Sequence, residues 1–545
     1  MRARHALHLG VIALAVIVAY AASVHGEWIS DDITSIAQNP VLRSLAPGNI
    51  LLIMSRFEGP NYAPLYMLSY AIDWAMFGND PTGFHVVNLL FHIADAALVY
   101  WLLLRLGERD ALAFGVALVW AVHPVQVESV AWITERKNVL STLFFLLAFI
   151  AYVRYSDHPR PRTYAAIVLL YLCGMLTKIN VIVLPAVMLT YELTYRARLR
   201  RRDVLATLPL FAIAAFLAWV NLHGNTTHGA NYHGGSLWVT LRTSATVIPQ
   251  YLRLIVAPFG LSSFYYTPLR ASWLDLDVLG SVILIVGLLG TACVLAWRRH
   301  PSAFWILWFF VTLSPMLNIV PFPALMDDRY LYIPLVGPLV LIAWGVDAVV
   351  RRTPAVGRAV PVLVGVAALA CVALTIARVP AFHDELSLWA DWALRTVYIT
   401  SDRPYGPAPR PRELQLLRDA LAKDESSAVL HNNLGGIAFE EGRMPDALAE
   451  LSRAYQLEPR NPAIALNLGR AYLYSRQPEA AARILEEAVR LEPPSYYANL
   501  NLARAYILNG DAPRASDALA RARAIRPTWS DLGQVEDALA RLERR

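Results

Sequence analysis

The chain has 545 residues, of which 56% are apolar and only 17% are charged, with a formal net charge of +6. The charge is unevenly spread: residues 381–545 hold 44 of the 90 charged side chains. Residues 1–380 are therefore only about 12% charged, against roughly 25% in ordinary globular proteins. So few charges cannot cover a soluble surface, which excludes a purely cytosolic enzyme, a disordered chain and a disulfide-stapled secreted domain.

Cysteine and lysine are both scarce. Three cysteines lie far apart in apolar runs, at Cys173, Cys293 and Cys371, so neither a disulfide framework nor a cysteine zinc site is expected. The positive charge comes almost wholly from arginine at span ends and on repeat helices, so no nucleic-acid partner is expected. This composition, with only three lysines, is typical of a bacterium with GC-rich DNA.

Eleven apolar runs are long enough to cross a bilayer, whose core takes about 20 apolar residues. They lie at about 8–24, 85–105, 111–127, 138–155, 163–179, 180–197, 203–222, 276–297, 302–320, 332–350 and 359–379. Residues 1–24 resemble a signal peptide, but the many later spans favour an uncleaved first span. The pattern predicts an all-α polytopic membrane domain over residues 1–380.

Arginines at alternate span ends predict the orientation, because positive loops stay cytoplasmic. They are Arg2/Arg4, Arg105/Arg109, Arg160/Arg162, Arg196 to Arg202, Arg298/Arg299 and Arg351/Arg352/Arg358. Eleven spans that start inside leave the C-terminus outside, together with 25–84, 123–137, 222–275 and 321–331. Residues 238–257 are apolar enough to cross, but crossing would upset the charge pattern, so we expect a re-entrant or interfacial helix.

Past residue 425 the sequence repeats itself every 34 residues. The corresponding positions are Leu434-Gly435, Leu468-Gly469 and Leu502-Ala503; Ala447, Ala481 and Ala515; Ala454, Ala488 and Ala522; and Pro459, Pro493 and Pro527. The period is that of the tetratricopeptide repeat, a helical hairpin that stacks into a solenoid. We predict a linker and partial capping helix at 381–426, then three repeats and a C-terminal capping helix at 427–545. The solenoid binds protein segments or serves only as a scaffold.

Asp31 and Asp32 follow the first span directly, on the predicted outer side. Two carboxylates at a membrane edge suit a general base for an acceptor hydroxyl, or a metal ligand. The alternative is a helix N-terminal cap or a solvated loop. The next stretch, from Tyr62 to Gly78, is amphipathic and too short to cross, so we expect it to lie along the membrane surface.

Several motifs together resemble one known family. They are Asp31-Asp32, Gly83-Phe84-His85-Val-Val-Asn88-Leu-Leu-Phe-His92, His123-Pro-Val-Gln-Val-Glu128-Ser-Val-Ala-Trp-Ile-Thr-Glu-Arg136-Lys137, Leu176-Thr-Lys178 and Asp328-Arg329-Tyr330-Leu-Tyr332-Ile-Pro334. With the repeats, they resemble the transmembrane and tetratricopeptide-repeat (TMTC-type) family of protein O-mannosyltransferases. The resemblance implies the GT-C glycosyltransferase fold and sugar transfer from a polyprenyl- or dolichyl-phosphate carrier to a protein hydroxyl. Ile179 and Lys137-Asn138 depart from the family pattern and leave the sugar open.

Four cations are predicted to hold the phosphate of the donor: Arg136, Lys137, Lys178 and Arg329. The topology places all four near outer span ends, and charges inside membrane domains usually serve function. Snorkelling to the interface is the alternative for Arg136 and Lys137.

His85, His123, Glu128 and Tyr330 are predicted to contact substrate. Tyr330 and Tyr332 can equally be interface-belt residues, and Glu128 can equally organise its loop. His92 shares a helical face with His85, but is expected to be packed and satisfied. The histidines at 223, 228 and 233 have no spacing typical of metal ligands.

The sequence therefore predicts a membrane glycosyltransferase that moves mannose or a similar sugar to Ser/Thr hydroxyls of exported proteins. Asp31 is assigned as the base and Asp32 as a partner of substrate or metal; whether a divalent metal is needed stays open. The expected location is a bacterial inner membrane with the site and repeats facing the periplasm, or the endoplasmic reticulum membrane in a eukaryote. Two alternatives stay open: an anchored repeat protein of the cell envelope that only binds partners, and a transferase acting on lipid or polysaccharide.

Overall fold

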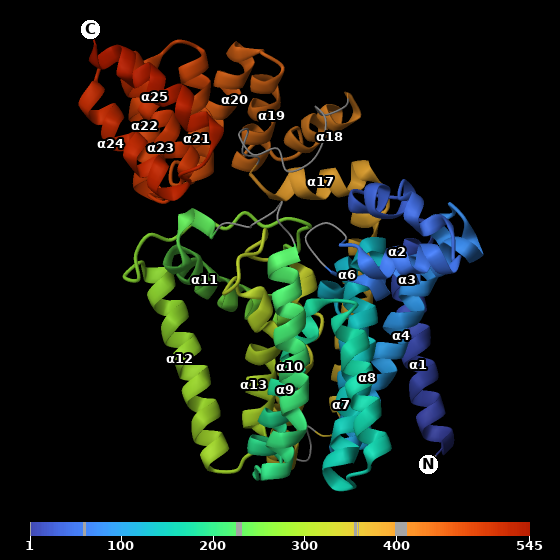
Figure 1. Cartoon of the computed structure of the whole chain (residues 1–545). Coiled ribbons are helices and arrows are strands. Elements are labelled where there is room, and N and C mark those ends of the chain that lie inside the picture. Colours follow the sequence, from blue (N-terminus) through green and yellow to red (C-terminus); the bar gives the residue numbers. More distant parts are fainter. Residues whose placement is uncertain are drawn as a thin grey trace.

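The computed structural model describes residues 2–57, 62–224, 232–353, 357, 359–397 and 411–544. Within these ranges every regular element is a helix, which confirms the all-α prediction. Figure 1 shows two parts, a bundle of long helices and a stack of shorter helices over one end of it. The stack lies at the end of the bundle opposite the N-terminus.

Each of the eleven predicted apolar runs coincides with a helix among the described residues. These are α1 (Arg2–Tyr20), α4 (Pro81–Arg105), α5 (Asp110–Ala121), α7 (Arg136–Asp157), α8 (Pro161–Met175), α9 (Leu184–Thr190), α10 (Arg201–Gly224), α12 (Leu276–Trp297), α13 (Ser302–Leu313), α14 (Val336–Arg352) and α16 (Val360–Arg378). Six helical stretches in the described chain are long and apolar enough to cross a membrane: Ala3–His25, Pro81–Arg105, Ile133–Asp157, Arg201–His223, Leu276–Trp297 and Val360–Phe382. The chain is therefore a membrane protein, but the predicted count of eleven spans is not confirmed.

Pro124 separates α5 from the short helical turns that follow it. His123 has extended backbone angles, as a residue before proline prefers. The chain then continues through short turns, η4 (Pro124–Gln126), α6 (Val127–Ala131) and η5 (Ile133–Glu135), before α7 begins. Helix α5 and the stretch Pro124–Ala131 are bent by 53° to each other. This break places a run of buried polar residues at one end of the bundle.

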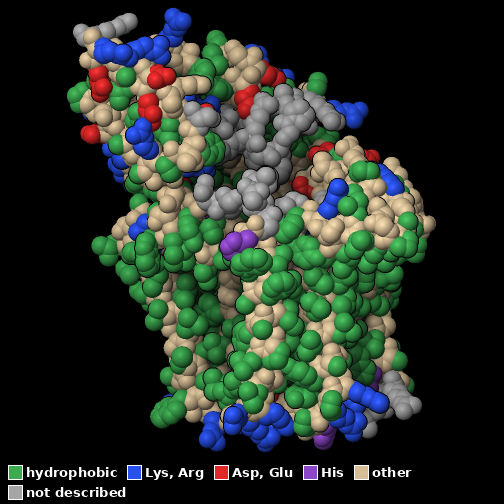
Figure 2. All heavy atoms as spheres, viewed as in Figure 1, with side chains coloured by type: hydrophobic (Ala, Val, Ile, Leu, Met, Phe, Trp, Pro, Cys, Tyr) green, Lys and Arg blue, Asp and Glu red, His purple; other side chains and the backbone are tan. Residues whose placement is uncertain are grey.

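The two ends of the bundle differ in charge. Figure 2 shows an apolar band around the bundle and a concentration of Lys and Arg side chains at the end away from the solenoid. Arginines there pair with acids of neighbouring helices, as in Arg196 with Asp157 and Arg109 with Asp347. The solenoid end carries three helices that are not among the six candidate spans: α2 (Pro47–Ser55), α3 (Pro64–Phe77) and α11 (Leu237–Val256). The stretches 62–78 and 238–257 thus form helices at the same end of the bundle.

The repeats form three helical hairpins, as the 34-residue period predicts. They are α19 (Ala428–Glu440) with α20 (Met444–Leu457), α21 (Pro462–Tyr474) with α22 (Pro478–Leu491), and α23 (Tyr496–Leu508) with α24 (Ala512–Ile525). Preceding them are α17 (Glu385–Arg395) and α18 (Pro411–Leu421), and α25 (Ser530–Glu543) follows. Small residues allow close packing inside each hairpin: a Cβ at Gly469 would lie 2.5 Å from Leu485 Cγ.

Candidate active site

The two acids of the Asp31-Asp32 pair have opposite environments. Asp32 is fully buried at 0% exposure, and its carboxylate accepts hydrogen bonds from the backbone N–H groups of Thr134 at 2.7 Å and Ile29 at 3.3 Å. Asp31 is exposed, and no hydrogen bond or ion pair to its carboxylate is found among the described residues. Ser30, directly before the pair, has φ of +47°, a left-handed conformation that is uncommon for a residue other than glycine. The loop thus anchors one acid and leaves the other accessible.

Burial also changes the acidity of the anchored carboxyl. Removing Asp32 from water raises its pKa to about 8, and the two backbone N–H donors oppose this shift only in part. Asp32 therefore binds its proton far more tightly than an exposed aspartic acid does. Its oxygens are occupied by the loop and by Thr134, so Asp32 holds the loop in place and Asp31 is the acid that can meet a substrate.

The segment that Asp32 contacts is itself held by several side chains. Tyr66 donates to the carbonyl of Thr134 at 3.0 Å and Tyr70 to that of Ile133 at 2.5 Å, both from α3. Asn88 of α4 also donates to the Ile133 carbonyl, at 3.3 Å. Residues 132–135 thus form a fixed strip between the Asp31 loop and the charged groups that follow it in the chain.

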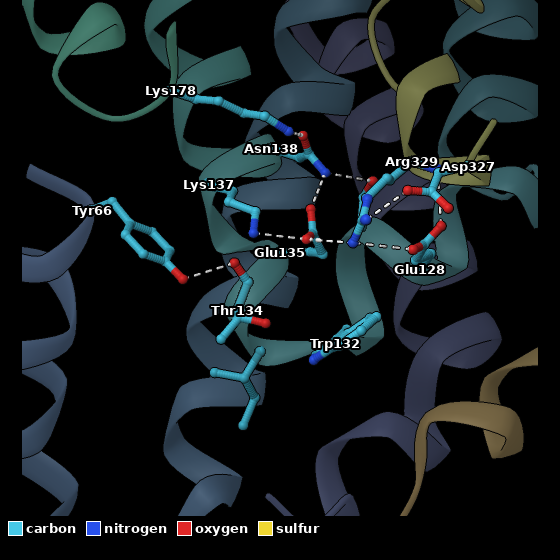
Figure 3. Close-up of polar contacts among 12 residues, drawn as sticks. Tyr66, Glu128, Trp132, Thr134, Glu135, Lys137, Asn138, Lys178, Asp327 and Arg329 are labelled. Atoms are coloured by element: carbon cyan, nitrogen blue, oxygen red, sulfur yellow. Dashed lines mark hydrogen bonds and ion pairs between the residues drawn. The ribbon is translucent and has the colours of Figure 1, made fainter. Parts of the chain in front are cut away.

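A cluster of charged side chains surrounds Arg329 at this strip, as Figure 3 shows. Arg329 Nη1 lies 2.8 Å from Glu135 Oε1 and 3.4 Å from Glu128 Oε1, and Nη2 lies 2.6 Å from Asp327 Oδ2. The backbone N–H of Arg329 donates to Glu128 Oε2 at 3.0 Å. The Arg329 side chain is 20% exposed, so it is not completely closed off from solvent.

Both predicted lysines reach the same cluster. Lys137 Nζ lies 2.9 Å from Glu135 Oε1 and its side chain is 30% exposed. Asn138 donates to Glu135 Oε2 at 2.6 Å and accepts a hydrogen bond from Lys178 Nζ through its Oδ1. A lysine ammonium has three donors, and each of these two uses only one in the contacts above. We call Glu128, Glu135, Lys137, Asn138, Lys178, Asp327 and Arg329 the Arg329 cluster.

Arg136 has different partners from the other three predicted cations. Its side chain is completely buried and forms an ion pair with Asp73 of α3. Nε donates to Asn88 Oδ1 at 2.7 Å and Nη2 to the Phe84 carbonyl at 2.9 Å. The guanidinium also lies 4.5 Å from the centre of the Tyr70 ring. These contacts favour a structural role, joining α3 and α4 to α7, over the predicted contact with phosphate.

Of the four predicted substrate contacts, only Glu128 joins the Arg329 cluster. His123 caps η4, where its Nδ1 accepts from Val125 N at 3.4 Å, and its Nε2 contacts the Ile255 carbonyl at 3.1 Å. Tyr330 is buried, packs against Phe322, and has its ring centre 5.9 Å from the guanidinium carbon of Arg329. These buried positions of His123 and Tyr330 favour structural roles over the predicted substrate contacts.

The two histidines of α4 also lie in the interior. His85 is buried against Gly26, where a Cβ would come within 2.8 Å of its Nε2. His85 therefore packs beneath the start of the Asp31 loop, without the exposure that substrate contact needs. His92 contacts Tyr332 Oη at 2.6 Å and the Ala121 carbonyl at 2.8 Å, which confirms that it is packed and satisfied.

The described residues contain no group of three or more His, Cys, Asp or Glu side chains arranged to hold a metal ion. Each Asp32 oxygen already accepts one backbone hydrogen bond, from Thr134 or from Ile29. Of the three histidines at 223, 228 and 233, the middle one lies outside the described residues.

The sequence analysis did not predict four polar partners of the cations. Asp73 is the partner of Arg136, and Glu135, Asn138 and Asp327 belong to the Arg329 cluster. Glu135 directly precedes Arg136 and Lys137 in a motif already singled out, and Asp327 directly precedes Asp328-Arg329. An acid beside a predicted phosphate-binding cation is a signal that could have been used, because buried charges are usually paired. No comparable signal connects Asp73 to Arg136.

Comparison with known proteins agrees with the two-part organisation. A tetratricopeptide-repeat family profile matches residues 438–481 and 473–542. The mouse protein O-mannosyl-transferase TMTC1 is 34% identical over 194 residues, which cover 32% of this chain and 21% of that protein. Human protein O-mannosyl-transferase TMTC2 is 30% identical over 266 residues, which cover 45% of this chain and 30% of the relative.

Over part of its length, the chain is thus similar to proteins of the TMTC type. Human TMTC4, another protein O-mannosyl-transferase, is 33% identical over 168 residues, covering 26% of this chain and 22% of its own length. The matched stretches thus span under a third of these relatives.

Solved structures also resemble the chain in part. The first tetratricopeptide domain of human RPAP3 is 21% identical and covers 22% of this chain and 95% of its own, with a TM-score of 0.20. A tetratricopeptide protein of Thermus thermophilus, TTC0263, is 18% identical and covers 34% of this chain and 95% of its own, with a TM-score of 0.23. Both scores are low, and the fold described above rests on the helices of this chain alone.

Proposed function

We propose that this chain is a membrane glycosyltransferase that moves a sugar from a polyprenyl-phosphate carrier to Ser or Thr hydroxyls of polypeptides. The observation that carries the proposal is the meeting of two functional groups at one end of the bundle. The accessible Asp31 lies next to an acid anchored on Thr134, and the adjacent residue, Glu135, belongs to the Arg329 cluster. The names of the TMTC-type relatives, all protein O-mannosyl-transferases, support the same reaction class.

The proposed reaction is a single displacement at the anomeric carbon. Asp31 accepts the proton of the acceptor hydroxyl as its oxygen attacks the anomeric carbon. The bond between that carbon and the phosphate oxygen breaks, and its electron pair leaves with the polyprenyl phosphate. One displacement inverts the anomeric centre, and no covalent enzyme intermediate is needed because a phosphate is a good leaving group.

The Arg329 cluster suits a transient phosphate partner. Lys137 and Arg329 are ion-paired with carboxylates of the cluster, and Lys178 donates to the amide oxygen of Asn138, so each of the three cations has a polar partner in the resting protein. A phosphate that enters would share the outward edges of Lys137, Lys178 and Arg329. Such charge-assisted hydrogen bonds strengthen as negative charge develops on the leaving oxygen.

The solenoid supplies the proposed acceptor surface. It stands over the same end of the bundle as the Asp31 loop, and tetratricopeptide solenoids commonly bind protein segments. A polypeptide held there would present its hydroxyl close to the membrane edge, where the lipid carrier resides.

Mass spectrometry of the exported proteins tests this function directly. Cells with the intact gene should carry hexose-modified Ser or Thr residues that deletion removes and that re-expression of the chain restores. If deletion leaves the proteins unchanged and instead removes a sugar from a lipid or polysaccharide, the acceptor assignment is wrong. If no glycosylated product changes, the chain is an envelope repeat protein without transferase activity.

Lys178→Ala is expected to raise the KM for the lipid-linked donor about tenfold or more, because it removes one charge-assisted contact to the phosphate. The KM for the acceptor should stay near the wild-type value. Transfer measured at varied donor and varied acceptor concentrations separates the two effects. Lys423→Ala is the matched control, since Lys423 is exposed beyond α18. Equal changes in the KM for donor and for acceptor would show that Lys178 is not a ligand of the phosphate.

We propose that the solenoid end faces the periplasm, because the arginine-rich end should stay cytoplasmic. In a cysteine-free background, Glu479→Cys in α22 should react with a membrane-impermeant maleimide in intact cells. Arg298→Cys, at the other end of the bundle, should react only after the membrane is opened. The reverse pattern would place the candidate active site in the cytoplasm and overturn the proposed donor and acceptor geometry.

A further inference from the structure

The segment between α11 and α12 runs between the membrane domain and the solenoid. On its membrane side, Tyr265 Oη donates to Asp328 Oδ1 at 2.6 Å. The backbone N–H of Ser263 donates to Asp391 Oδ2 at 2.9 Å, and Asp391 is ion-paired with Arg378 at the end of α16. The segment is therefore fixed to the end of the bundle by a tyrosine and by a buried ion pair.

Tyr266, which directly follows Tyr265 in the chain, contacts the solenoid. Tyr266 Oη donates to Glu492 Oε2 at 3.1 Å, and the Leu269 N–H donates to Glu492 Oε1 at 2.8 Å. Glu492 is the C-cap of α22 and is only 7% exposed. The Tyr266 ring packs against an apolar cluster from the linker and the first two repeats: Val397, Ala428, Ala454, Ala463 and Ile464. A membrane-domain loop thus occupies part of the solenoid surface.

Both carboxyls at the ends of this connection are buried. Burial raises the pKa of Glu492 to about 7, against the effect of the Leu269 and Tyr266 donors. Burial likewise raises the pKa of Asp328 to about 7, with Arg378 and Tyr265 opposing the shift. Each acid accepts a hydrogen bond from its tyrosine hydroxyl within this buried setting.

Asp328 links this connection to the candidate active site. It begins η10 (Asp328–Leu331), and the next residue is Arg329, the centre of the Arg329 cluster. Holding Asp328 limits the motion of the backbone that carries the guanidinium. Two neighbouring tyrosines consequently join the C-cap of a repeat helix to the turn that carries a proposed phosphate ligand.

We propose that Tyr265 and Tyr266 couple the position of the solenoid to the position of Arg329, with Glu492 as the positioning residue on the solenoid. Acceptor binding that shifts the solenoid would then be felt at the donor phosphate, and donor binding would in turn be felt at the acceptor surface. The link itself is a property of the structure. Only its effect on sugar transfer rests on the function proposed above.

Hydrogen exchange of the full chain in lipid nanodiscs tests the link without an activity assay. Glu492→Ala removes the acceptor of two hydrogen bonds, so amide exchange should rise about fivefold in residues 262–270 and also in 328–332. Glu492→Gln keeps an acceptor oxygen for the Leu269 N–H, and its amide N–H can donate to the Tyr266 hydroxyl, which also accepts, so this variant should stay close to wild type. Glu479→Ala, in the first turn of the same helix and exposed, is the matched control and should change neither segment.

A second variant separates coupling from simple docking. Tyr265→Phe removes the contact with Asp328 and the hydrogen bond that Tyr265 Oη accepts from the Ser262 N–H, but no contact with the solenoid. It should therefore raise exchange in 328–332 and at the Ser262 amide, and leave residues around Glu492 protected. Adding Glu492→Ala to Tyr265→Phe should then produce no further rise in 328–332, because the path is already broken. If Glu492→Ala frees 262–270 but never affects 328–332, the solenoid is merely docked and the coupling proposal is wrong.

The kinetic consequence is measured separately. Glu492→Ala should raise the KM for the lipid-linked donor about fivefold, although Glu492 belongs to the solenoid, and Glu492→Gln should restore it. An unchanged donor KM would show that the link does not affect the reaction. A wild-type chain with no transfer activity would overturn the proposed function, while the exchange experiment would still decide on the coupling.

Discussion

Asp31→Asn is expected to lower sugar transfer by roughly 100- to 10,000-fold, the usual contribution of a positioned general base. The amide has nearly the same shape but cannot accept the proton of the acceptor hydroxyl. Asp31 is exposed and is not used as a contact within the described structure, so expression, membrane insertion and thermal stability should stay at wild-type levels. Initial rates at saturating donor and acceptor, measured beside thermal unfolding, give both quantities.

Asp32→Asn serves as the comparison and should behave differently. The Asn side chain has one acceptor oxygen, so it can keep the bond from Thr134 N–H or from Ile29 N–H, but not both. Its amide group faces the remaining N–H, which should loosen the loop and lower stability as well as rate. Full transfer activity in Asp31→Asn, Asp32→Asn and the double variant would remove the acid pair from catalysis and favour the interaction-protein alternative.

Local sequence features predicted the elements of this fold well. The length of an apolar run and a 34-residue period are properties of consecutive residues, and each such run and repeat coincides with helices in the structure. The number of spans was harder to predict, because several apolar helices, such as α8, α9 and α13, are short or broken. Length and hydropathy alone do not decide whether a short helix crosses.

The site was predicted in part, and the errors have a common cause. Arg136 and Lys137 are adjacent, and neighbouring residues on a helix project about 100° apart. One therefore faces Asp73 and the other Glu135, a difference that a motif cannot show. Two partners of Arg329, Glu128 and Glu135, come from positions about 200 residues earlier in the chain, and only tertiary packing brings them to it. Asp32 was likewise expected to meet substrate, but it binds a backbone segment that follows it by 102 positions.

The buried placement of Arg136 leads to a second large expected effect. Arg136→Met should destabilise the protein by about 3–5 kcal/mol, because it leaves the carboxylate of Asp73 buried without its partner. Asp73 is almost fully buried beside the guanidinium, so water cannot replace the lost charge. Denaturant or thermal unfolding in matched detergent measures the loss, and the yield of folded protein should fall with it.

Two further variants decide between this structural role and the phosphate contact that the sequence predicted. The double variant Arg136→Met with Asp73→Leu should recover most of the stability, since a buried ion pair can often be exchanged for apolar residues at little cost. Lys137→Met, one residue further along the helix and 30% exposed, should leave stability nearly unchanged while raising the donor KM. If Arg136→Met instead kept wild-type stability and raised only the donor KM, Arg136 would be assigned to the phosphate site, as the sequence predicted. The α3–α4 contact would then have to be held by the remaining pairs, such as Tyr70 with Ile133 and Asn88 with the same carbonyl.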